Sequence, residues 1–333
     1  MKKLAVIILN WNGLHLLQRF LPAAVEHTVC IEADLVVADN GSTDGSPDWV
    51  EREFPQVRLI RFDRNYGFAE GYNKAITECG NPYVVLLNSD VEVTPGWWRP
   101  MLEFMEDNPD VGALQPKILS YLDKSSFEYA GAAGGFLDVL GYPYCRGRLF
   151  DCVEKDHGQY DGEPVDIVWA SGACLMTRRK LYMRVGGLDP RFFAHMEEID
   201  LCCRILNAGY RVCALTQSAV YHVGGASLNQ GNPKKTYLNF RNNLLLLHKN
   251  LPPAKGKRKL ILRRLMDTLA FMMYLVKGDF RNAAAILRAH RDFIKMKQFY
   301  TEFPASDILG LQPGSDKNAV FERYIKRKKI LLP

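Results

Sequence analysis

Leu35-Val-Val-Ala-Asp-Asn-Gly-Ser-Thr-Asp-Gly-Ser46 is the stretch of sequence that decides the fold. Its first four residues are apolar, as expected of a short strand that is buried on both faces of a parallel sheet. All the residues after them are Asp, Asn, Gly, Ser or Thr, which favour turns. A buried strand that ends abruptly in polar turn residues is typical of open α/β sheets, which bind ligands at the carboxyl ends of their strands.

Apolar runs on either side repeat this pattern. Residues 4–9 are apolar and end at Asn10, and residues 83–87 are apolar and end in Asn88-Ser-Asp90. Between the runs, apolar residues recur at helical spacing ahead of Pro22, around Trp49 and over 68–79, and a further short strand is expected over 57–60. This alternation predicts an α/β domain with an open, mostly parallel central sheet flanked by helices.

Three predicted strands therefore end in polar residues: Asn10, Asp39, and Asn88 with Asp90. The Asp39 carboxylate could accept a hydrogen bond from a pyrimidine N–H or a ribose hydroxyl. Asp90 could hold a divalent cation that bridges two phosphates, because Mg²⁺ is usually bound by one or two carboxylates plus substrate oxygens. Each of these residues taken alone also fits an ordinary turn or strand end.

A glycine-containing segment, Asn65-Tyr-Gly67-Phe-Ala-Glu-Gly71, leads from a loop into a predicted helix. Free backbone N–H groups at such a helix start favour anions, which makes this segment a candidate phosphate cradle. Close packing of the helix against the sheet is the alternative explanation, and it applies most directly to Gly71.

Glu197, Glu198 and Asp200 form an acidic cluster at the start of a later predicted helix. Acids at a helix N-terminus complement the helix dipole, and Asp200 with Arg204 makes an i, i+4 pair. The alternative is that one carboxylate acts as a general base, its pKa raised by burial near other acids. His222 closes a later strand, where it could be a metal ligand or a structural residue.

The composition is that of a globular protein with a full-sized core. The chain has 333 residues, of which 47% are hydrophobic and 24% charged, enough for one large α/β domain with an appendage. Its eight cysteines include no C-x-x-C pair, so we expect neither a disulfide framework nor a zinc site, and a reducing cytosol fits best. The apolar run at 4–9 is too short for a typical secretion signal.

The C-terminal part of the sequence is helical in pattern and basic. Apolar residues recur at helical spacing at Leu262, Leu265, Leu269, Met272 and Val276, beside a basic cluster over 255–264. The longest uncharged run, 268–276, is far below the roughly 20 residues needed to span a bilayer. The stripe could dock on the cytoplasmic face of a membrane or pack against the catalytic domain.

Taken in order, these segments resemble family 2 glycosyltransferases with the GT-A fold, and above all bacterial rhamnosyltransferase-like members. Besides the segments above, the resemblance includes Trp169-Ala-Ser-Gly-Ala173, Phe192-Phe-Ala-His-Met-Glu-Glu-Ile-Asp-Leu201, His222 and Tyr237-Leu-Asn-Phe-Arg-Asn242. It implies a GT-A catalytic domain over 1–250, with a nucleotide-sugar-binding half (1–110) and an acceptor-binding half (111–250). A helical, basic extension over 251–333 follows.

The resemblance also implies roles for individual residues. Those implied for the donor are Asn10, Asp39, Asn65, Gly67, Asn88 and Asp90; those for the acceptor are Trp169, Gly172 and Ala173. Asp90 and His222 would bind a divalent metal, Mg²⁺ or Mn²⁺, and Glu198 would be the base. Two positions depart from the family pattern: Asn88 replaces the first acid of D-x-D, and Glu198 replaces a commoner Asp. Glu197 and Asp200 therefore stay candidates for the base.

The activity that the resemblance implies is inverting transfer of a sugar, rhamnose among the candidates, from a dTDP- or UDP-sugar. The acceptor would be a hydroxyl of a glycan or lipid-linked saccharide in cell-surface polysaccharide synthesis. We expect a cytoplasmic enzyme, peripheral on the inner face of the membrane, and no nucleic-acid partner. Two alternatives are a sugar nucleotidyltransferase, which should open with a Gly-rich, Arg-containing loop absent from 10–13, and a non-catalytic carbohydrate-binding protein.

Overall fold

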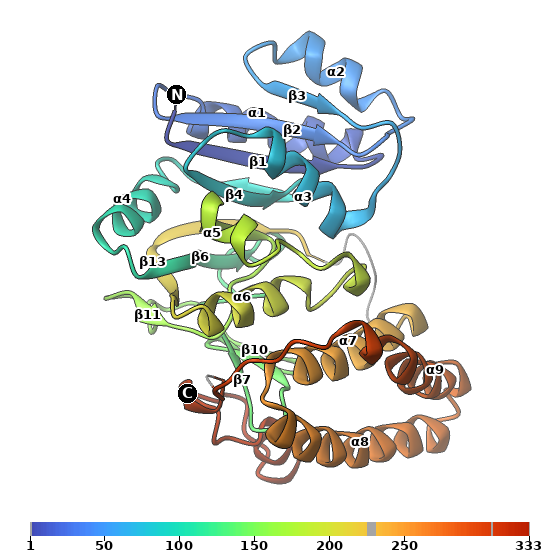
Figure 1. Ribbon diagram of the computed structural model, residues 1–333. Coiled ribbons are helices and arrows are strands. Elements are labelled where there is room, and N and C mark those ends of the chain that lie inside the picture. The colour runs from blue at the N-terminus through green and yellow to red at the C-terminus, as the bar shows by residue number, and fades with distance from the viewer. Residues whose placement is uncertain (1, 225–230, 308, 333) are drawn as a thin grey trace.

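The computed structural model describes residues 2–224, 231–307 and 309–332, and its centre is a mixed, mostly parallel β-sheet (Figure 1). Within these residues the order is β11-β13-β6-β12-β4-β1-β2-β3, with β5 paired to β13. Strands β1 to β4 are parallel, β12 is antiparallel to both of its neighbours, and β6 is parallel to β13. The strands are β1 (Leu4–Asn10), β2 (Ala33–Asp39), β3 (Arg58–Arg61), β4 (Tyr83–Asn88), β5 (Val91–Val93), β6 (Val111–Ser120), β11 (Val165–Asp166), β12 (Cys174–Arg178) and β13 (Arg211–His222).

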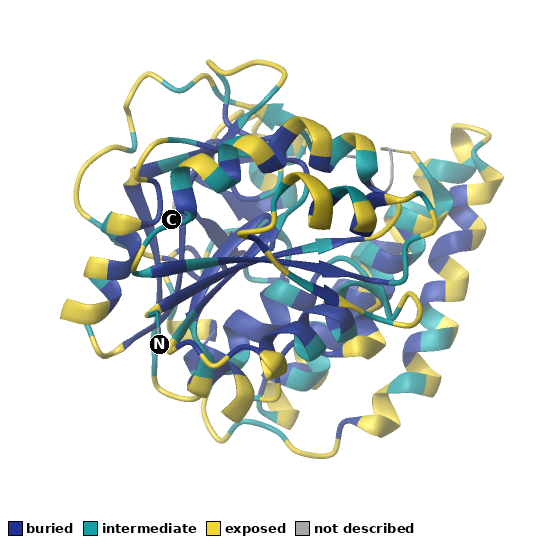
Figure 2. Cartoon of the chain, turned by 90° about the horizontal axis from the view of Figure 1, so that it is seen from above, coloured by how far each residue is buried: buried dark blue, intermediate teal, exposed yellow. Residues whose placement is uncertain are grey.

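Helices cover both faces of this sheet, as the sequence predicts. Alternate residues of β1 enter two separate cores, Ala5 and Ile7 on one face and Val6 and Ile8 on the other. Helices α1, α2 and α4 supply the second core, and α3, α5 and α6 the first. Their bounds are α1 (Leu14–Thr28), α2 (Ser46–Glu53), α3 (Gly67–Glu78), α4 (Arg99–Asp107), α5 (Arg179–Arg184) and α6 (Glu197–Asn207). In Figure 2 the strands are dark blue and the surrounding helices are yellow on their outward sides.

Helix α1 continues where the sequence suggested an end. It runs through Pro22 to Thr28. Proline lacks an N–H, so the carbonyl of Gln18 loses its helical partner. Both residues are exposed, and water can therefore hydrogen-bond to that carbonyl.

A second, four-stranded antiparallel sheet lies beside β11 and β13 and carries the connection from β6 to β12. Its strands are β7 (Gly135–Leu137), β8 (Pro143–Cys145), β9 (Arg148–Leu149) and β10 (Cys152–Val153). A short 3₁₀ turn, η1 (Pro190–Phe192), precedes α6, and further turns follow at η2 (Lys297–Phe299), η3 (Leu309–Leu311) and η4 (Phe321–Ile325).

Three long helices form the C-terminal region: α7 (Pro233–Asn250), α8 (Pro253–Val276) and α9 (Phe280–Met296). They lie at the end of the molecule opposite α2 and β3, with α8 outermost (Figure 1). Among the described residues, no helix is both long and apolar enough to cross a bilayer. The division of the chain at residue 250 stays a prediction, since α7 packs against α6, α8 and α9 alike.

The apolar stripe of α8 does not pack on the catalytic domain. Leu265, Leu269 and Met272 are 58%, 61% and 51% exposed, and Val276 is 85% exposed. The sequence predicts that the stripe either docks on a membrane or packs against the catalytic domain, and the exposure of these side chains excludes packing against the catalytic domain. Trp97 and Trp98 lie in the core, each 2% exposed.

Candidate active site

Asn10 and Asp39 end neighbouring parallel strands and lie side by side in the register of β1 with β2. Asn10 Nδ2 donates to Asp39 Oδ1 (3.1 Å) and to Ser46 Oγ (2.8 Å), and Ser42 N donates to Asp39 Oδ2 (2.9 Å). Both side chains are buried, yet Asn10 Oδ1 has no hydrogen-bond partner. A buried polar atom without a partner is rare and marks a position where a ligand donor would be accepted.

Asn65 and Gly67 lie in the loop before α3, and Asn40, directly after β2, holds this loop in place. Asn40 Nδ2 donates to Asn65 Oδ1 and to Gly67 O, each at 3.0 Å. The Gly67 amide, a candidate phosphate donor, donates to Asn65 Oδ1 at 2.7 Å. Gly67 adopts φ +78°, a left-handed conformation that glycine tolerates best. A side chain at Gly71 would come within 3.0 Å of Leu9, so Gly71 serves close packing of α3 on the sheet.

Asp90 and His222 meet at the far end of β4. The turn after β4 leads into β5, and β5 pairs with the last residues of β13, so that Val91 is opposite His222. Asp90 Oδ1 lies 3.1 Å from His222 Nε2, and Asn88 Nδ2 lies 3.4 Å from the same nitrogen. Asp90 and His222 are each 6% exposed.

Glu128 completes this cluster, and sequence reasoning missed it. Its Oε2 lies 3.5 Å from His222 Nδ1, too long for a strong hydrogen bond but close enough for an ion pair. Burial acts to lower the pKa of His222, but its interactions with Asp90 and Glu128 outweigh burial and raise this pKa to about 10. The only signal in the sequence was an acid between two aromatic residues, Phe127 and Tyr129.

The residues at this position fit a divalent cation. Ligand bonds of about 2.1 Å in an octahedron place adjacent ligands roughly 3 Å apart, which matches the separation of Asp90 Oδ1 and His222 Nε2. Over the part of the chain that the structure describes, no group of three or more His, Cys, Asp or Glu side chains forms a metal site. The protein therefore offers two donors, and further ligands would have to come from substrate oxygens or water.

Glu197 and Glu198 begin α6 after a strained loop. Phe193, His195 and Met196 all have positive φ (66°, 67° and 73°), which is uncommon for residues other than glycine and costs free energy. Burial and then the charge of Glu198 raise the pKa of Glu197 well above its ordinary value, and burial raises the pKa of Glu198 to about 7. In both side chains Oε2 is buried without a hydrogen-bond partner. Such a pair is suited to accepting a proton near neutral pH.

Gly172 and Ala173 connect Glu198 to the end of β4. A side-chain carbon added to Gly172 would lie 3.6 Å from Glu198 Cβ and 3.6 Å from the ring of Phe68. The next residue, Ala173, accepts a hydrogen bond from the Asn88 amide at 3.0 Å. The structure thus places Glu198, Gly172 and Asn88 along one edge of the sheet.

Both carboxylate oxygens of Asp200 have hydrogen-bond partners, unlike those of Glu197 and Glu198. It is fully buried; its Oδ2 accepts from Arg204 Nη2 (2.8 Å) and Lys249 Nζ (2.9 Å), and its Oδ1 from Asn250 Nδ2 (2.8 Å). A carboxylate held by two cations and an amide joins α6 to α7.

Trp169 lies away from the surface. Its indole is 3% exposed, its Nε1 donates to Phe136 O (3.0 Å), and a side chain on Gly135 would clash with the ring at 2.2 Å. This side chain packs between the two sheets, where an acceptor could not contact it directly.

Arg241 and Asn242 of α7 hold the strained loop before α6. Asn242 Nδ2 donates to the carbonyls of Phe192 (2.9 Å), Ala194 (2.9 Å) and His195 (2.7 Å), and Arg241 Nη2 donates to Phe192 O (2.8 Å). The sequence drew attention to 237–242 only through the resemblance and gave these residues no role.

The sequence of this chain matches a family model and relatives of known activity. The model described as "Glycosyl transferase family 2" matches residues 5–185. The "N-acetylglucosaminyl-diphospho-decaprenol L-rhamnosyltransferase" of Mycobacterium tuberculosis is 30% identical over 240 residues, covering 66% of this chain and 75% of that protein.

Solved structures support the fold. A structure titled as S. aureus TarS 1-349 in complex with UDP-GlcNAc aligns with a TM-score of 0.60 and 15% identity, covering 89% of this chain and 81% of that one. GalNAc-T7 with UDP, GalNAc and Mn²⁺ aligns with a TM-score of 0.57 and 15% identity. That alignment covers 75% of this chain, which spans about half (48%) of the GalNAc-T7 chain.

Proposed function

The chain belongs to glycosyl transferase family 2, and from that premise we propose that Glu198 is the base of an inverting sugar transfer. The observation that carries the proposal is a buried carboxylate with a free Oε2 and a pKa of about 7, next to Gly172 on the edge that bears the strand-end residues. Membership of this family makes the protein a glycosyltransferase with a nucleotide-sugar donor. What we propose concerns the roles of its residues, the identity of its substrates and its location in the cell.

Glu198 rather than Glu197 is assigned as the base because the charge of Glu198 adds to burial in raising the pKa of Glu197, whereas burial alone raises the pKa of Glu198. Glu197 is the more deeply buried, 5% exposed, and its pKa is raised well above the ordinary value. Glu198 ionises near pH 7 and is therefore the member of the pair assigned as the base. Glu198 then takes the proton of the acceptor hydroxyl as the hydroxyl oxygen attacks the anomeric carbon. The nucleoside diphosphate departs from the opposite face, which inverts the configuration.

The donor is proposed to lie across the ends of β1, β2 and β4. Asp39 and the free Asn10 Oδ1 are placed to accept hydrogen bonds from the nucleoside, and Asn88 and Asp90 lie on the side of the diphosphate. Asn65 and Gly67 shape the loop that borders the nucleoside, since their polar groups are engaged with each other. We propose a dTDP- or UDP-sugar as donor, with rhamnose among the sugars to be tested.

Asp90 and His222 are proposed to hold Mg²⁺ or Mn²⁺ together with the donor. A bound cation supplies charge stabilisation of the departing diphosphate. His222 must lose a proton to ligate through Nε2, and its remaining Nδ1–H would point toward Glu128. Mn²⁺ in the structure of GalNAc-T7 supports a cation in this fold.

The proposed acceptor is a glycan or lipid-linked saccharide hydroxyl in cell-surface polysaccharide synthesis. The relative from M. tuberculosis is named for a diphospho-decaprenol-linked sugar, which supports a lipid-linked acceptor. Gly172 and Ala173 line its approach to Glu198. We place the enzyme in the cytoplasm, peripheral on the inner face of the membrane; its eight free cysteines, several of them buried, are compatible with a reducing compartment.

Protection against thermal unfolding tests the donor assignment. A ligand that binds only the folded state raises the unfolding temperature. We expect one nucleotide class among dTDP-, UDP- and GDP-sugars to protect the chain, and Asp39→Ala to remove that protection. Equal protection of wild type and Asp39→Ala would show that the nucleoside binds elsewhere.

A further inference from the structure

Helix α8 buries one ion pair, Arg263 with Asp267, against the protein and turns large apolar residues toward solvent. Arg263 and Asp267 are 4% and 0% exposed; Arg263 Nε donates to Asp267 Oδ1 at 2.8 Å, and His290 of α9 contacts Asp267 Oδ2 at 2.9 Å. The Arg263 guanidinium also lies 3.7 Å from the centroid of the Tyr142 ring. These contacts fix the rotation of α8, so its outward face is determined by the fold.

That outward face, called here the α8 apolar face, exposes large side chains over more than four helical turns. Each member is more than half exposed: Ile261, Leu265, Leu269, Met272 and Val276. Leu262 (44%) and Met273 (49%) flank it. Contiguous exposed apolar surface of this kind marks an interaction site. Since no described helix could cross a bilayer, insertion would be limited to an interface.

Exposed cations surround the N-terminal end of the α8 apolar face. Lys257, Arg258 and Arg264 form no ion pair with any described residue, and the single acid of α8, Asp267, is fully buried. The exposed side of α8 therefore presents apolar groups and positive charge without a carboxylate. A second copy of the same face would match the apolar groups but could not neutralise the charge. An anionic lipid surface does both.

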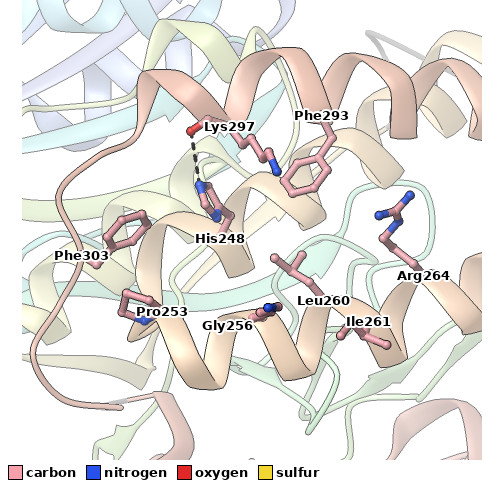
Figure 3. A pocket seen from close by; sticks show the side chains of 10 residues that line it. His248, Pro253, Gly256, Leu260, Ile261, Arg264, Phe293, Lys297 and Phe303 are labelled. Carbon is pink, nitrogen blue, oxygen red and sulfur yellow. Dashed lines mark hydrogen bonds between the residues drawn. The ribbon is translucent and has the colours of Figure 1, made fainter.

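A cavity of ≈ 390 Å³ opens beside this end of the face (Figure 3). Leu260, Ile261 and Phe293 give it apolar walls, and Lys257, Arg264 and Lys297 bring three cations to it. Ile261 belongs both to the cavity and to the α8 apolar face. Apolar walls with a basic margin suit the phosphate of a lipid and the first part of its chain.

We infer that the α8 apolar face and this basic cavity rest on an anionic lipid bilayer, with a lipid phosphate held by Lys257, Arg264 and Lys297. The inference rests on the proposed function in one respect, that a lipid-linked acceptor is met at a membrane. It goes further by naming the surface, its orientation and the class of lipid. The opposite end of the sheet, with α2 and β3, would then point away from the membrane (Figure 1).

Flotation of the full chain with vesicles tests the inference. One set contains phosphatidylcholine alone and the other phosphatidylcholine with phosphatidylglycerol. We expect binding to the anionic vesicles only, weakened by salt, and no displacement by inorganic phosphate at the same phosphate concentration. Lys257→Glu with Arg264→Glu should reduce partitioning by roughly fivefold or more per residue.

The apolar part is tested by the double variant Leu265→Ser, Leu269→Ser, for which we expect at least roughly a tenfold loss of vesicle binding. Ile31→Ser with Leu122→Ser is the matched control, because these side chains are as large and even more exposed (88% and 79%) but lie elsewhere. Binding to neutral vesicles alone, displacement by inorganic phosphate, or unchanged binding of the double variant would overturn the inference. So would a wild-type dimer that the double variant dissociates, because a second copy would then cover the face.

Nucleotide protection is measured on the same samples, and vesicle binding needs no turnover. Glu198→Gln should float like wild type even if transfer is lost. A protein that binds nucleotide but no vesicles leaves the proposed transfer reaction standing and removes this inference together with the membrane location.

Discussion

Asp90 Oδ1 lies 3.1 Å from His222 Nε2 because β5, which follows Asp90, pairs with the end of β13. The pair joins the end of β4 to β13, the strand that precedes α7. Glu128, from the segment after β6, approaches the other ring nitrogen at 3.5 Å. A carboxylate and an imidazole from distant segments are thus held at the spacing of adjacent metal ligands.

We predict that Glu128→Gln weakens Mn²⁺-dependent donor binding by roughly 10–100-fold, the range for loss of an outer partner of a ligating histidine. A titration of Mn²⁺ at fixed nucleotide, followed by thermal unfolding, measures this. Glu92→Gln is the control, since Glu92 lies on β5 but pairs with the exposed Lys124. If wild type binds the donor equally well with Mn²⁺ and with chelator, and Glu128→Gln behaves in the same way, then no cation binds at this position.

The pKa of Glu198, about 7, predicts how transfer depends on pH. A base acts only when ionised, so the rate at saturating donor should rise about tenfold per pH unit below 7 and level off above it. A rate that is flat between about pH 5.5 and 8 would contradict Glu198 as the titrating base.

Stability should show the opposite trend. The pKa of folded Glu198 is raised above its ordinary 4.5, so between 4.5 and about 7 the folded state holds more protons than the unfolded state. The free energy of unfolding therefore falls as pH rises through this window, by on the order of 3 kcal/mol. Denaturant unfolding of wild type and Glu198→Gln measures it; the difference between the two proteins should grow with pH.

Asn242→Ala is predicted to disturb the loop before α6 while donor binding is largely kept. It removes the donor to three carbonyls around η1 and α6, costing about 1–3 kcal/mol, and should lower the transfer rate more than donor affinity. Asn243→Ala is matched in type and burial, but its side chain holds the carbonyl of Gly141 instead. Equal loss of rate in both variants would assign Asn242 to general stability.

Asp200→Asn should destabilise the protein without moving the pH profile of transfer. Breaking a buried carboxylate with two cationic partners costs about 3–5 kcal/mol. Lys249 still pairs with Asp189 (2.8 Å) in Asp200→Asn, so the double change Asp200→Asn, Lys249→Met should not recover that loss, because it takes this cation from Asp189. A shifted pH midpoint in the residual activity would make Asp200 part of the proton-accepting group.

The fold could be predicted from sequence because local patterns determine it. Continuous apolar runs at β1, β2 and β4 end in Asn10, Asp39 and Asn88, and the parallel sheet brings those ends to one edge. Family membership confirms the glycosyltransferase assignment. The residue roles stay predictions, although the structure places most of these residues along that edge.

The features that could not be predicted from the sequence depend on contacts between distant segments and on the rotation of a helix about its axis. Glu128 reaches His222 only through the connection from β6 to the small sheet, and Asp200 meets Lys249 only when α7 packs on α6. Periodicity predicted an amphipathic α8 but not which side faces solvent. The buried Arg263–Asp267 pair decides that, because a paired charge can be buried opposite an apolar face.

The role of Glu198 as the base is tested by the rate of transfer by Glu198→Gln, measured beside its donor affinity in one preparation. The side chain keeps its size but cannot take a proton. We predict a rate lower by roughly 10²–10⁴-fold with donor protection unchanged. Unchanged turnover at wild-type donor affinity would contradict the assignment of Glu198 as the base of an inverting transfer.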